Sequence, residues 1–64
     1  MSQMEIAQRL KGMKRGGEFS VGTNKERIIA LNVAKVLRNA GTIDFQIVTR
    51  KNENNGFTIA AIGA

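Results

Sequence analysis

TNKERIIALNVAKVLRNAG, residues 23–41, predicts the long central helix around which the rest of the chain is organised. Thr23 precedes Glu26 by three residues, which is the spacing of a capping box at the start of a helix. Gly41 stands where a residue in the left-handed conformation commonly ends one. We therefore predict a helix over about residues 24–40.

The two faces of this helix differ in chemistry. At about 100° per residue, one apolar face is expected to pack on the core, and it consists of Ile29, Val33, Val36, Leu37 and Ala40. The opposite face mixes cations with aliphatic side chains, and it consists of Arg27, Ile28, Leu31, Lys35 and Arg38. Exposed aliphatic side chains among cations need a partner, which is either the first helix or another subunit. We therefore expect a partner or dimer interface at Ile28, Leu31 and Lys35.

The C-terminal third of the chain predicts a β-hairpin, because two segments rich in β-branched and aromatic residues flank a turn signal. The two segments are IDFQIVTRK (43–51) and GFTIAAI (56–62), and the turn signal is NENNG (52–56). A two-residue turn at Asn55 and Gly56 would set the apolar residues of the two strands on opposite faces. A three-residue loop over 54–56, with Gly56 left-handed, pairs Thr49 with Ala61 and avoids this. The shared apolar face then consists of Phe45, Ile47, Phe57, Ile59 and Ala61.

The first segment, SQMEIAQRLKGMK, predicts a shorter helix that begins with Ser2 and Glu5 at the spacing of a second capping box. One narrow apolar stripe follows at helical spacing, and it consists of Ile6, Leu10 and Met13. A helix over about residues 3–14 is marginal in water by itself, so it needs a surface to dock on. Because the glycine pair 16–17 ends it, we expect residues 1–16 to form a mobile helical arm.

The order of elements predicts an α+β fold. Between the helices, Phe19 and Val21 alternate with polar residues, so Glu18–Val21 forms either a short strand or an extended connector. With the strand, the order is β-α-β-β behind a helical arm, and residues 1–64 make a single small domain. A winged helix-turn-helix is a minor alternative, because roughly eight residues separate the helices where that motif has a turn of 3–4.

Composition excludes most enzyme chemistry. The chain has no Cys and no His, which excludes disulfides, thiolate or imidazole metal sites, and Cys or His catalysts. Two of its five acidic residues, Glu5 and Glu26, are explained by the capping boxes. Asp44 and Glu53 would lie roughly 30 Å apart along one strand, which is too far for them to act on one bond. We expect no enzyme activity and no cofactor.

Ten Lys and Arg against five Asp and Glu give a net charge of +5, which favours a partner with a negative field. Two basic clusters precede and follow the central helix: Arg9, Lys11, Lys14 and Arg15, then Arg50 and Lys51. Cations that neutralise phosphates provide most of the affinity for nucleic acid. We therefore predict non-enzymatic nucleic-acid binding through these six residues, to DNA in preference to RNA. The three Phe are assigned to the core, so stacking on bases is not expected.

The stretch TRKNENNGFTIAAI (49–62), which follows a basic helix, is similar to small uncharacterised proteins encoded by bacteriophages. The resemblance extends over about residues 18–62. It implies one of two roles, either binding DNA or binding and blocking a host protein.

Three further expectations concern location and assembly. No apolar run reaches the roughly 18 residues of a membrane span and no signal-peptide pattern is present, so we expect a cytoplasmic protein. The cations that flank the apolar stripe of the first helix would also suit an anionic membrane surface. A hairpin with an exposed edge is marginal alone, which favours a homodimer.

Overall fold

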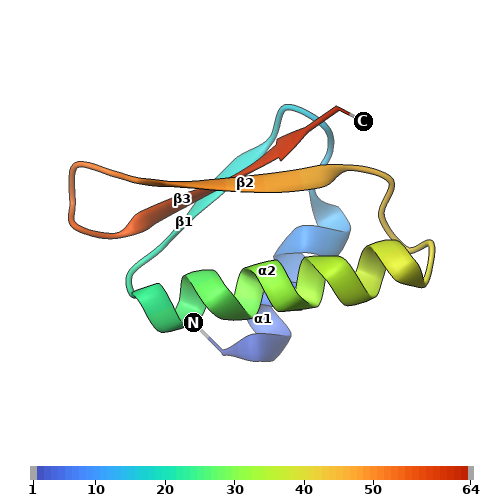
Figure 1. Ribbon diagram of the computed structural model, residues 1–64, viewed down its shortest axis with the longest axis horizontal. Helices are drawn as coiled ribbons and strands as arrows, with labels where there is room; N and C mark the ends of the chain where they lie inside the picture. The colour runs from blue at the N-terminus through green and yellow to red at the C-terminus, as the bar shows by residue number, and fades with distance from the viewer. Residues whose placement is uncertain (1, 64) are drawn as a thin grey trace.

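The computed structural model describes residues 2–63 and confirms the α+β class. Its elements are α1 (Gln3–Gly12), β1 (Glu18–Val21), α2 (Asn24–Asn39), β2 (Gln46–Lys51) and β3 (Phe57–Ile62). The strands form one antiparallel sheet in the order β1-β3-β2, so Glu18–Val21 is a strand and the last strand lies in the middle. Both helices lie on one face of this sheet, and the other face is open (Figure 1).

Both ends of α2 follow the local signals of the sequence. The Thr23 hydroxyl accepts a hydrogen bond from the Glu26 amide at 3.1 Å, and the Glu26 carboxylate accepts one from the Thr23 amide at 3.1 Å, which completes the predicted capping box. At the other end, Gly41 has a φ of 76°, and the Thr42 amide donates to the Leu37 carbonyl at 2.8 Å. These bonds satisfy carbonyl groups that the helix end leaves free.

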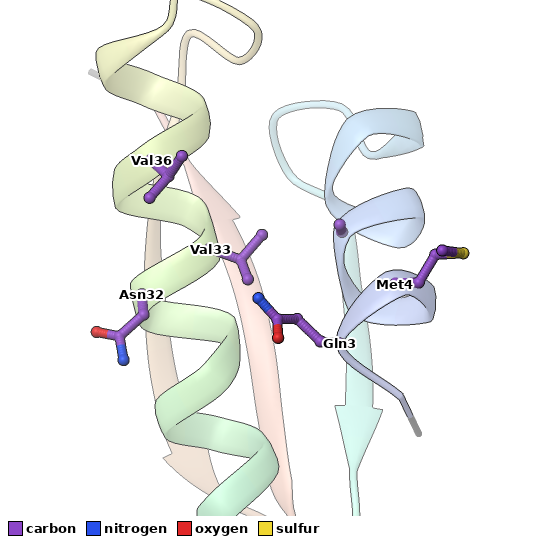
Figure 2. A pocket seen from close by; sticks show the side chains of 6 residues that line it. Gln3, Met4, Asn32, Val33 and Val36 are labelled. Atoms are coloured by element: carbon purple, nitrogen blue, oxygen red, sulfur yellow. The ribbon is translucent and has the colours of Figure 1, made fainter.

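The buried face of α2 differs from the predicted one. Ala30, Ala34 and Leu37 are buried, whereas Val36 is 65% exposed and Ala40 is exposed, so placing these last two in the core was wrong. The prediction placed the first helix or another subunit against the face of Ile28 and Leu31, but α1 packs on the flank of α2 that carries Val33, while the sheet covers Ala30, Ala34 and Leu37. Val33 points into the space between the two helices (Figure 2).

The first helix docks on α2 through its predicted stripe. Ile6 and Leu10 are fully buried, and Met13 is half-buried against the same core. The helix ends at Gly12 rather than at Lys14, since Met13 is already extended and caps the helix with its amide on the Leu10 carbonyl at 3.2 Å. The apolar stripe of α1 therefore packs in the core of the molecule.

The glycine pair after α1 is hydrogen-bonded to the sheet. The Gly17 amide donates to the Lys14 carbonyl at 2.8 Å and closes a turn in which Gly16 has a φ of 86°. The Gly16 amide donates to the Ala61 carbonyl at 3.0 Å, and the Ala61 amide donates to the Gly17 carbonyl at 2.9 Å. Two residues thus oppose one, which is a β-bulge at the start of β1. That residues 1–16 move as an arm stays a prediction.

The hairpin was predicted on the right face but in the wrong register. Thr49 pairs with Ile59 rather than with Ala61, a shift of two residues. Because side chains alternate with a period of two, this shift leaves the predicted apolar residues together on the face toward the helices. The loop over 53–55 has Asn55 in the left-handed conformation, with a φ of 61°, where Gly56 was predicted. The Asn52 side chain stabilises it by accepting hydrogen bonds from the amides of Asn54 and Gly56, both at 3.0 Å.

Gly56 is required for a different reason, which is close approach between strands. It is buried, and a Cβ atom at this position would collide with the carbonyl oxygen of Val21 in β1. The neighbouring Phe57 and Val21 are directly paired across β3 and β1. A side chain at position 56 would therefore push the hairpin away from β1.

We predict that Gly56→Ala lowers the free energy of unfolding by about 1–3 kcal/mol, the usual cost of overpacking a closely packed site. Gly12→Ala is the matched control, because a Cβ there meets no atom within 4 Å and alanine favours helix, so stability should stay the same or rise by up to about 1 kcal/mol. Urea unfolding followed by circular dichroism measures both. Equal unfolding midpoints for wild type and Gly56→Ala would contradict the conclusion that Gly56 is required for close approach to Val21.

Candidate functional site

The four cations of the Arg9–Arg15 run do not form one surface. Arg9 and Lys11 are separated by about 200° around α1, so they point to nearly opposite flanks. Arg15 extends across the end of the sheet, where its Nη2 lies 3.4 Å from Asp44 Oδ2. The run therefore contributes separate contacts in three directions, and only part of it can touch one ligand.

Arg9 and Lys14 line an open groove of about 450 Å³ between α1 and β1. Met13 and Phe19 contribute its apolar wall, and Glu18 is the one carboxylate among the residues that line it. Phe19 was assigned to the core, and it is only half-buried because its other side faces this groove. We call this region the β1 groove.

Arg50 reaches Glu18, one of the residues that line the β1 groove, from the other edge of the sheet. Its Nη2 lies 3.0 Å from Glu18 Oε2, across the central strand and on the face that the helices leave open. The Glu18 carboxylate, which lines the groove, is therefore already paired. Neither Arg9 nor Lys14 has a salt bridge within the part of the chain that the structure describes. The groove therefore retains two uncompensated positive charges beside a third that is paired.

Lys51 lies away from the β1 groove. It pairs with Phe57 across the hairpin, on the face toward the helices, and the Arg27 guanidinium lies 5.3 Å from the centroid of the Phe57 ring. Lys51 and Arg27 thus share one aromatic neighbour beside the start of α2. No pattern in the sequence predicts this contact, because it depends on the hairpin register.

The predicted interface on α2 is partly exposed. Ile28 is 45% exposed, Lys35 is exposed and Leu31 is half-buried. A second apolar surface, which the sequence did not predict, lies on the other flank of α2. It is a groove of about 530 Å³ between the helices (Figure 2), lined by Gln3, Met4, Ala7, Asn32, Val33 and Val36. It was missed because Val36 was expected in the core.

The capping carboxylate of α1 titrates below its usual range. The Ser2 backbone amide donates to Glu5 Oε1 at 3.1 Å, and this bond, followed by the bond with the Ser2 hydroxyl, lowers the pKa of Glu5. The ionised cap therefore stabilises α1 at pH values above the unfolded-state pKa, and this contribution disappears as the pH falls through the lowered folded-state pKa. Glu5 stays charged at neutral pH as part of the helix.

No protein-family model matches this chain, and no curated protein or solved structure gives a match.

Within residues 2–63 no helix is long and apolar enough to cross a bilayer, and no three His, Cys, Asp or Glu side chains lie together as metal ligands. Ile6 and Leu10 are fully buried, so membrane-surface binding by this stripe would require α1 to leave α2.

We predict that the pair between Glu18 and Arg50 adds little to stability. Both side chains are more than half exposed, at 56% and 60%, and exposed ion pairs contribute about 0.2–1 kcal/mol. A double-mutant cycle with Glu18→Gln and Arg50→Gln, measured by urea unfolding, should give a coupling energy in this range that decreases in 1 M salt. A coupling energy well above it would mean that the pair holds the sheet together.

Proposed function

We propose that this protein is a non-enzymatic nucleic-acid-binding protein that holds a phosphate backbone along the β1 groove. The observation that supports this most is the meeting of two basic clusters, far apart in the sequence, at one strand. Arg9 and Lys14 line the groove, and Arg50 reaches its carboxylate from the opposite edge of the sheet. A cytoplasmic location and a partner of DNA rather than RNA fit this role, and the resemblance to bacteriophage-encoded proteins favours DNA.

The groove suits contacts with phosphate and sugar better than it suits reading of bases. Arg9 and Lys14 supply mobile donors for phosphate oxygens, and Met13 and Phe19 supply an apolar surface between them. One half-buried Phe is a small stacking surface compared with the aromatic platforms of single-strand binding proteins. We therefore expect weak sequence preference and a dissociation constant of about 10⁻⁴–10⁻⁶ M, the range of binding through phosphates alone.

The remaining predicted cations act at longer range in this proposal. Lys11 lies on the far flank of α1, Arg15 extends across the end of the sheet to Asp44, and Lys51 is paired with Phe57 on the face toward the helices. They raise the positive potential around the molecule and the rate of encounter with a polyanion. The direct contacts are assigned to Arg9, Lys14 and Arg50.

We predict a salt dependence that reports these three contacts. Each neutralised phosphate contributes about −0.9 to the slope of log K against log salt, so three contacts reduce affinity roughly 40-fold between about 50 and 200 mM salt. Fluorescence anisotropy with labelled duplex DNA, single-stranded DNA and RNA of equal length measures this. Binding that does not respond to salt, or no binding at low salt, would overturn the proposal.

We also predict that Arg9→Glu with Lys14→Glu weakens DNA binding sharply and reduces the salt slope by about two. Lys11→Glu with Lys25→Glu is the matched control, because it makes the same change in net charge on exposed residues outside the groove. The control should retain most of the affinity. An equal loss in both double variants would show that net charge alone drives binding, and the β1 groove would then be rejected as the site.

The groove between the helices supports a second candidate function, a module that binds a host protein. Met4 and Val36 are 72% and 65% exposed on its rim, and all six of its lining residues are uncharged. Affinity capture from nuclease-treated lysate, with Val36→Lys as the comparison, tests it. A protein retained by wild type and lost with Val36→Lys supports this function, and capture that nuclease abolishes supports DNA binding instead.

A further inference from the structure

Among residues 2–63, no strand covers the backbone groups at the outer edge of β2. The Asn52 amide donates to the Gly56 carbonyl at 3.0 Å, which fixes the alternation of the hairpin ladder. Residues 46, 48 and 50 then point their amides and carbonyls toward β3, and residues 47, 49 and 51 point theirs away from it. Ile47, Thr49 and Lys51 thus form a free hydrogen-bonding edge.

The two edges of the sheet are protected differently. β1 is four residues long and begins with the bulge at the glycine pair, and both features hinder pairing with another strand. β2 is six residues long and contains no glycine, proline or bulge. Its only protection is the charge of Arg50 and Lys51 at one end. β2 is therefore the edge that is open to another strand.

The helix below this edge adds an apolar contact. α2 packs on β2 and β3 and runs alongside β2 at the same side of the molecule (Figure 1). Arg27 reaches the ring of Phe57 from the flank of α2 that faces away from α1, and Leu31 follows one turn later on that flank. On α2, Leu31 is half-buried and Ile28 is 45% exposed, and Val48 is 41% exposed on the open face of the sheet.

We propose that a second copy of this chain pairs with β2 in the antiparallel direction, which gives a six-stranded sheet of order β1-β3-β2-β2-β3-β1. All helices then lie on one face, because a continuous antiparallel ladder keeps the two faces of the sheet apart. Both β1 grooves remain free at the outer edges. This inference does not depend on nucleic-acid binding.

Charge selects the register of this pairing. With Val48 opposite Val48 of the second copy, Arg50 faces Gln46, and the two Arg50 Cα positions lie about 13 Å apart along the strands, beyond the Debye length of roughly 8 Å. If one strand slides by two residues in one direction, the two Arg50 Cα positions come to about 7 Å from each other along the strands. The opposite slide leaves only about three residues of each strand paired. The register with Val48 opposite Val48 avoids both the repulsion between the two Arg50 residues and the loss of paired residues.

The spacing of the helices agrees with this arrangement. The α2 axis lies over β2 and β3, so it is about 5 Å from the symmetry axis when strands are about 4.8 Å apart. The two α2 helices then lie about 10 Å apart, which is within the usual range for packed helices. This contact covers Leu31 of both copies, on a flank of α2 that also carries Arg27.

Sedimentation equilibrium of the full chain tests the proposal. A dimer is expected, and it should become tighter at about 0.5 M salt, because screening reduces the repulsion between two copies of net charge +5. Thr49→Pro removes an outward amide without breaking the hairpin ladder and should give a folded monomer. Ser20→Pro makes the same change at the β1 edge and should stay dimeric. A wild-type monomer at millimolar concentration and high salt overturns the proposal.

Two further variants keep the test informative if Thr49→Pro does not fold. Val48→Cys should form a disulfide-linked dimer on oxidation, because residues opposite each other in such a pair have Cα atoms about 4.5 Å apart and the chain has no other Cys. Ile62 is 39% exposed on the same face but lies in the central strand. Ile62→Cys should therefore show no disulfide-linked dimer when gels run without and with reductant are compared. Equal cross-linking of both, or loss of the dimer with Val36→Lys in the groove between the helices, overturns the assignment to β2.

Discussion

The burial of α2 between the sheet and α1 is the interaction on which the rest of this structure depends. A helix of ten residues and a two-stranded hairpin are both marginal in water when isolated. Each gains its stability here by covering a different side of α2, through Ile6 and Leu10 on one side and Ile59 and Ala61 on the other. Because the buried centre of α2 is made of Ala30 and Ala34, the backbone of the helix can approach both neighbours closely.

The sequence predicted the features that local chemistry determines. Both capping boxes and the left-handed Gly41 involve residues within five positions of each other, and all three were predicted correctly. The errors concern contacts between distant segments. The exposed position of Val36 depends on where α1 docks, and the hairpin register depends on Gly56 fitting against Val21. Neither constraint can be read from a pattern within one element.

The same distinction applies to the candidate site. The cations were identified from composition, but their grouping required the strand order. The run that looked continuous separates, since Arg9 and Lys14 turn to the β1 groove while Arg15 pairs with Asp44. Arg50 reaches Glu18, beside the groove, because β3 lies between β1 and β2 and brings its guanidinium to this carboxylate on the open face. A topology with β2 beyond the reach of β1 would separate these charges.

The central position of β3 also constrains how the chain can fold during synthesis. Both β1 and β2 pair only with this last strand, and Ala61 also holds the bulge that follows α1. No part of the sheet can therefore form until β3 has left the ribosome, and before that point the emerging chain can assemble only its two helices. The pairing of β1 with β3 joins segments far apart in the sequence, and contacts of this kind slow folding because the intervening chain must first be closed into a loop.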